Sequence, residues 1–156
     1  MKIHLCVVGR LLNGPEKELI HDYLHRFEKI GRAHGLGPVL VNEVEDKKNG
    51  GMLNEAILLQ RVIPKGAKVI ILDERGEVIS SPNFAKKISS YANNSISDLA
   101  IIIGGADGID PKLREQADYK VSFGKMVWLH ALVRVMISEQ LYRAASILAG
   151  SPYHRS

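Results

Sequence analysis

The chain has 156 residues, of which 46% are hydrophobic and 24% charged, with a formal net charge of +4. This length fits one domain with a single core, and the composition is ordinary for a soluble globular protein. No apolar stretch approaches the roughly 20 residues of a membrane span, and the short apolar run at the start is not typical of a signal peptide. The single cysteine, Cys6, excludes an internal disulfide. We therefore expect one cytoplasmic domain over residues 1–156, without a membrane partner.

The positive charge is concentrated in the last third of the chain. Residues 1–110 contain 14 basic and 14 acidic residues, whereas residues 111–156 contain seven basic residues and three acidic ones. A local basic surface favours a polyanion such as RNA, although an excess of four charges is weak evidence by itself.

Strands and helices are predicted in alternation from the N-terminus. Apolar residues alternate with others over residues 2–7, which is the period of a strand, and Cys6 is expected to be buried in it. Apolar residues at helical spacing over residues 19–30 predict a helix whose His21 and His25 lie on a solvated face.

The same alternation continues to the C-terminus. Ser81 is the expected cap of a helix that starts at Pro82, and Asp110 the cap of a short helix that starts at Pro111. The other expected elements are strands over Pro38–Val44, Lys68–Asp73, Leu99–Gly105 and Tyr119–Ser122, and helices over Met52–Val62 and His130–Ala149. This alternation predicts an α/β domain with a parallel sheet covered on both faces.

Three glycine-bearing loops, LDERGE, GGADG and FGKMVWLH, leave the carboxyl ends of predicted strands, where open parallel sheets bind ligands. The turns contain Gly76, Gly104 with Gly105, and Gly124, and the third loop contains the only tryptophan, Trp128. Neither G-x-G-x-x-G nor G-x-x-x-x-G-K-[ST] occurs, which disfavours a dinucleotide or P-loop site. The glycines indicate either tight turns alone or a site for a flat heterocycle such as adenine.

Five motifs, in order, make the chain similar to the ribosomal RNA large subunit methyltransferase H family of SPOUT (trefoil-knotted) methyltransferases. They are LDERG (Leu72–Gly76), IGGADG (Ile103–Gly108), SFGKMVWLH (Ser122–His130), EQLYRA (Glu139–Ala144) and PYHR (Pro152–Arg155). The resemblance extends from the start of the chain to its end. It implies a single-domain parallel-sheet α/β fold with a C-terminal trefoil knot, which periodicity alone does not predict.

The resemblance also implies an activity. A homodimer would transfer a methyl group from S-adenosylmethionine, without a metal, to N3 of a pseudouridine in the 23S ribosomal RNA of the assembled ribosome. The implied cofactor contacts are Leu72, Gly104, Phe123, Gly124, Lys125, Met126, Val127 and Trp128. The family usually has proline where this chain has Leu129, and proline would stiffen the entry to the last helix.

The candidates for the reacting end lie near the C-terminus. The PYHR tail fits a frayed, solvated end equally well, but the resemblance makes it an element that reaches over the methyl donor of its own or the partner subunit. We assign the N3 proton to His154 and a phosphate or developing oxyanion to Arg155, with Tyr153 and His130 as further candidates.

Two more charged positions on the final helix have alternative interpretations. Glu139 and Arg143 are four residues apart, which fits an ordinary surface pair or an Arg143 that faces RNA at the dimer seam, oriented by Glu139. Arg134 is expected to be solvated or to contact phosphate.

Two other classes of function compete with the enzyme. One is a non-catalytic ribosome- or RNA-binding protein that retains the knotted fold, and the other is a nucleotide-dependent oxidoreductase. The missing dinucleotide fingerprint disfavours the oxidoreductase. The glycine loops, Trp128 and the tail favour the enzyme, since a binding protein needs no cofactor pocket.

Overall fold

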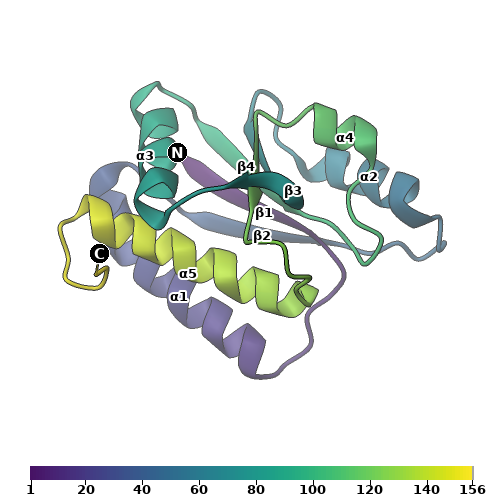
Figure 1. The fold of residues 1–156 in the computed structure, drawn as a ribbon, viewed down its shortest axis with the longest axis horizontal. Helices are drawn as coiled ribbons and strands as arrows, with labels where there is room; N and C mark the ends of the chain where they lie inside the picture. Colours follow the sequence, from purple (N-terminus) through teal and green to yellow (C-terminus); the bar gives the residue numbers. More distant parts are fainter. Residues whose placement is uncertain (156) are drawn as a thin grey trace.

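Five parallel strands form one sheet, in the order β2-β1-β4-β3-β5 (Figure 1). The strands of the computed structural model, which describes residues 1–155, are β1 (Lys2–Val8), β2 (Val39–Val44), β3 (Lys68–Val78), β4 (Asp98–Ile103) and β5 (Tyr119–Ser122). The helices are α1 (Pro15–Gly31), α2 (Gly51–Val62), α3 (Ser81–Asn93), α4 (Pro111–Glu115) and α5 (His130–Leu148), with a 3₁₀ turn at Arg32–His34. The predicted parallel α/β architecture is confirmed, and the trefoil knot stays a prediction.

Helices cover both faces of the sheet and create two apolar layers. On one face, Ile3 and Leu5 pack with residues of α1, α3 and α5, including Phe27. On the other face, Cys6 packs with residues of α2 and α4. Cys6 is fully buried, as predicted, and burial raises the pKa of its thiol to about 11.

Helices α1 and α5 pack side by side along one face of the sheet, and both begin at the same end of the molecule (Figure 1). His21 and His25 lie on the exposed side of α1, as predicted. No helix within residues 1–155 is long and apolar enough to cross a membrane.

The predicted cap of α3 and the predicted ends of β3 and β4 are wrong. Strand β4 ends at Ile103, two residues before the predicted Gly105. The side chain of Ser80, rather than Ser81, caps α3 by accepting a hydrogen bond from the Asn83 amide (3.3 Å). Strand β3 continues to Val78, because the chain bulges after Leu72 and returns to pair with β5 a second time. A Cβ atom on Gly76 would lie 2.7 Å from the Lys120 carbonyl carbon, so this return requires glycine.

The prediction that Arg134 is solvated is also wrong. Its side chain is 7% exposed and forms an ion pair with Glu43 (Nη1 to Oε2, 2.8 Å). Its Nη2 donates to the carbonyl oxygens of Val8 (3.2 Å) and Gly9 (2.6 Å) at the end of β1. Arg134 therefore fastens the first turns of α5 to the carboxyl ends of β1 and β2.

Candidate active site

The three glycine-bearing loops meet at one cavity of about 460 Å³ at the carboxyl edge of the sheet, beside the start of α5. This volume lies in the usual range for small-molecule sites. Seven of the eight predicted cofactor contacts line the cavity: Leu72, Gly104, Phe123, Gly124, Met126, Val127 and Trp128. The eighth, Lys125, is exposed on the same loop but does not line it. The structure thus brings together three segments that are far apart in the sequence.

Gly104 of the central loop is required by the loop itself. A Cβ atom on Gly104 would lie 2.6 Å from Cγ1 of Ile109 and 2.9 Å from the Gly108 oxygen. A Cβ atom on Gly105 would meet the carboxylate end of Glu55, a flexible side chain of α2. The tight-turn interpretation therefore holds for Gly104, and the folded turn presents its backbone to the cavity.

The sequence did not mark Asp73 as a site residue, but Asp73 lines the cavity with a side chain that is only 6% exposed. Burial acts to raise the pKa of Asp73, but hydrogen bonds from the Arg75 amide and guanidinium, together with the charge of Arg114, outweigh it and lower the pKa. A carboxylate that stays ionised therefore lies at the bulge of β3, directly after Leu72. Its position directly after a continuous apolar strand is the signal that could have identified it.

The third loop forms an apolar rim that is open to solvent. Val127 is 87% exposed, Met126 73% and Leu129 66%, whereas Trp128, at 40%, is more enclosed. His130 and Val133, at the start of α5, complete this wall of the cavity. Of the residues considered for the reacting end, only His130 touches the cavity within one chain.

The backbone at Leu129 already has the conformation of proline. Its φ is −63°, and its carbonyl oxygen accepts the first hydrogen bond of α5, from Val133 (3.0 Å). The fixed φ of proline would remove freedom from the loop without changing its folded shape. We therefore expect Leu129→Pro to tighten cofactor binding several-fold, as measured by calorimetric titration. Equal or weaker affinity of the variant would contradict this expectation.

The C-terminal tail folds back onto α5 and is held by one carboxylate oxygen, Oε1 of Glu139. This atom accepts hydrogen bonds from the Tyr153 hydroxyl (3.0 Å) and from Nε (2.9 Å) and Nη2 (2.5 Å) of Arg143. The Tyr153 ring also lies against Tyr142, with centroids 4.5 Å apart, and under the Arg143 guanidinium. Burial and the contact with Glu139 raise the pKa of Tyr153, so its hydroxyl stays protonated. The tail is therefore an ordered segment that is held by side-chain contacts with α5, and not a frayed end.

His154 belongs to the same cluster. Its Nδ1 lies 3.2 Å from Nη1 of Arg143. Because a guanidinium can only donate, Nδ1 is the acceptor, and the proton of a neutral His154 is on Nε2. In this arrangement the neutral ring can donate a hydrogen bond from Nε2, but it has no free lone pair that could accept a proton. The prediction that His154 accepts the N3 proton therefore does not fit this geometry.

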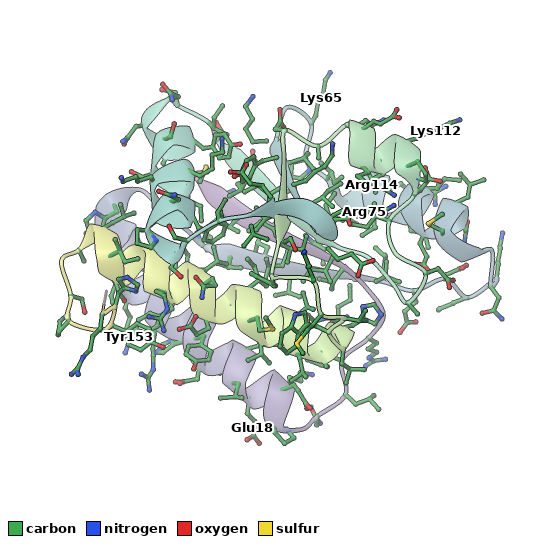
Figure 2. The ribbon with its side chains drawn as sticks, in the orientation of Figure 1. Glu18, Lys65, Arg75, Lys112, Arg114 and Tyr153 are labelled. Carbon is green, nitrogen blue, oxygen red and sulfur yellow. The ribbon has the colours of Figure 1, made fainter. Side chains whose placement is uncertain are left out.

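The predicted site residues thus form two groups on one helix. The cavity adjoins the start of α5 at His130, whereas the tail folds back onto Glu139 and Arg143, near the labelled Tyr153 in Figure 2. Glu139 lies nine residues after His130, which is about 13 Å along the helix axis. No residue of the tail up to Arg155 lines the cavity, so within one chain the tail does not cover it.

A family model described as "Predicted SPOUT methyltransferase" matches residues 1–154. The chain therefore belongs to the SPOUT methyltransferases and is an enzyme of this class. A probable methylase family protein from Haemophilus influenzae shares the fold, with a TM-score of 0.57 at 14% identity over 99% of this chain and 70% of that one.

Relatives of known name are much more similar in sequence. A protein of Roseobacter denitrificans named Ribosomal RNA large subunit methyltransferase H is 64% identical over 156 residues, the whole of both chains. A protein of a Ruegeria species with the same name is 62% identical over 155 residues, 99% of each chain. The chain belongs to the ribosomal RNA large subunit methyltransferase H family.

Proposed function

We propose that this chain transfers the methyl group of S-adenosylmethionine to N3 of a pseudouridine in 23S ribosomal RNA of the assembled ribosome, as a cytoplasmic homodimer. The observation that carries the proposal is the convergence of the three predicted loops on one cavity. The names of the relatives, which specify large-subunit ribosomal RNA, support the substrate class.

The cavity suits the adenosine part of the cofactor. Apolar side chains of Leu72, Ile103 and Val121 line it, and the Gly104–Gly105 turn leaves its backbone accessible for hydrogen bonds. A flat heterocycle needs this combination of apolar walls and a few polar backbone groups. Among residues 1–155 no cluster of side chains could hold a metal ion, and the proposed chemistry requires none.

When bound, S-adenosylmethionine would supply an electrophilic methyl group: its carbon–sulfur electron pair would stay on sulfur as the bond to N3 forms, after N3 has released its proton to solvent. The protein aligns the two reactants and excludes water. The Nε2–H of His154 is suited to donate to a base carbonyl oxygen that becomes more negative as N3 deprotonates. Arg155, exposed at the end of the tail, is suited to a phosphate.

The separation of these groups supports a homodimer. The tail of one chain is held at Glu139 and Arg143 and, up to Arg155, contributes no residue to the cavity of the same chain, which adjoins His130. If two copies pair with their α5 helices antiparallel, each tail lies over the cavity of the other copy. The exposed apolar rim at Met126, Val127 and Leu129 is then covered.

Mixed dimers test whether the tail acts on the partner. One variant carries a blocked cavity (Gly104→Leu), and the other carries a defective tail (His154→Ala). Each alone is expected to be inactive, and after co-refolding the mixture is expected to regain activity, since one of the two sites in a mixed dimer is intact. A mixture that stays inactive, although mixed dimers form, would show that the tail acts within its own chain.

Mass spectrometry of ribosomal RNA tests the substrate. Cells that lack the gene are expected to lose one methylated pseudouridine, and the wild-type gene but not His154→Ala is expected to restore it. If the deletion leaves every methylated pseudouridine in place, the substrate assignment is wrong.

Equilibrium dialysis tests the non-catalytic alternative, because a protein that only binds RNA would retain neither S-adenosylmethionine nor NAD.

A further inference from the structure

Arg114, on α4, lies behind the cavity without lining it, and it contacts two of the three loops. Its Nε forms an ion pair with Oδ2 of Asp73 (3.0 Å), and its Nη2 donates to the carbonyl oxygen of Ile109 (3.2 Å). Both partners line the cavity, Asp73 directly after Leu72 and Ile109 at the end of the glycine loop. Figure 2 shows Arg114 beside Arg75, with Lys112 of the same helix directed away from them.

We propose that Arg114 is a positioning residue that joins these two walls of the cavity before the cofactor binds. The ligand's identity rests on the proposed function, whereas the connection between the walls does not.

The carboxylate of Asp73 has two arginine partners, but only one of them crosses between loops. Arg75 belongs to the same turn as Asp73, and its amide and Nε both bind Oδ1 (2.9 and 3.2 Å). These bonds shape the turn locally and connect it to nothing else. Arg114 is 41 positions away in the chain, so its ion pair adds a side-chain connection between the β3 loop and the glycine loop to the backbone pairing of Leu72 with Ile103.

The glycine loop needs such a connection. Three of the six residues over Ile103–Gly108 are glycines, and one backbone hydrogen bond, from Gly108 to Gly105 (3.0 Å), closes the turn. Glycine-rich chain loses more conformational entropy on ordering than other sequences do. If the folded protein already holds the loop, the cofactor does not bear this cost when it binds.

The chemistry of the contact requires arginine. The Nε atom of Arg114 is inaccessible to solvent and makes no hydrogen bond within residues 1–155, so its 3.0 Å approach to Oδ2 of Asp73, whose side chain is 6% exposed, is an ion pair shielded from water. The planar guanidinium places its charge beside this carboxylate while its Nη2 donates to the carbonyl oxygen of Ile109. A lysine ammonium has no such fixed geometry, and Arg114→Lys is expected to restore only part of the function.

Cofactor affinity is the first measurement. We expect Arg114→Ala to raise the Kd and the KM for S-adenosylmethionine on the order of tenfold, with kcat at saturating cofactor within about twofold of the wild type. Lys112→Ala is the matched control, because it removes the same charge from an exposed position on the same helix and is expected to change neither constant. A loss of kcat with unchanged KM would overturn the proposal.

Hydrogen exchange of the cofactor-free protein is the second measurement. In Arg114→Ala the amides of residues 73–76 and 104–109 are expected to exchange faster, while those of α1 and the tail keep their wild-type rates. Unchanged exchange at both loops, or faster exchange throughout the chain, would overturn the proposal. Because this readout needs no cofactor, it decides the role of Arg114 even if the wild type fails to bind S-adenosylmethionine, which would refute the proposed function.

Discussion

Glu139→Ala is expected to reduce methyl transfer to ribosomes on the order of 100-fold while leaving the Kd for S-adenosylmethionine within about twofold of the wild type. One oxygen of Glu139 holds both Tyr153 and Arg143, and Arg143 holds His154. Without this carboxylate the tail loses its position. The cavity stays intact, because Glu139 does not line it.

Single-turnover transfer and calorimetric titration measure the two parts of this expectation. Glu18→Ala is a suitable control, because Glu18 is an exposed glutamate on α1 with no part in the tail cluster. Glu139→Gln retains an acceptor oxygen but loses the charge, so it is expected to lie between the wild type and Glu139→Ala. If transfer and affinity fell together in Glu139→Ala, the tail and the cavity would not be the separate parts proposed here.

Arg134→Ala is expected to lower the free energy of unfolding by about 3 kcal/mol, at the lower end of the range for a broken buried ion pair, because Glu43 is one-third exposed and regains water. The substitution also leaves the carbonyl oxygens of Val8 and Gly9 without their donor. Urea unfolding at neutral pH measures the difference. Arg26→Ala is the control, since Arg26 pairs with Asp22 in solvent and a surface pair contributes little.

The penalty of Arg134→Ala is expected to shrink at acidic pH. Burial acts to raise the pKa of Glu43, but the Leu11 amide and Arg134 outweigh it and lower the pKa. A lowered pKa in the folded state means that the contribution of Glu43 is present at neutral pH and is lost as the pH falls through its folded pKa. A penalty that stays constant down to strongly acidic pH would contradict the role of this ion pair.

Local patterns were sufficient to predict most of the fold. The strand Tyr119–Ser122 and the cap of α4 by Asp110 were predicted as the structure has them, because period and capping depend on neighbouring residues. The extension of β3 to Val78 was missed, because ERGEV is polar and is a strand only through its second pairing with β5. That pairing joins residues more than 40 positions apart and leaves no local pattern.

The site was predicted in part for a similar reason. The glycine loops were found because the carboxyl ends of parallel strands share one edge of the sheet. Arg134 was expected in solvent, since nothing in its neighbourhood on the helix shows that the end of β1 supplies carbonyl acceptors. Asp73 and Arg114 were not selected, because their contact crosses the cavity wall between two loops.

The position of both functional groups on one helix restricts how α5 can change. Each added residue turns everything beyond it by about 100° and advances it by about 1.5 Å. One inserted residue would therefore rotate the tail away from its target, whereas deletion or insertion near a whole turn would keep its direction. The number of residues between His130 and Glu139 thus sets the direction in which the tail is held relative to the start of α5. Length variation among functional relatives is therefore expected in the surface loops and not in this helix.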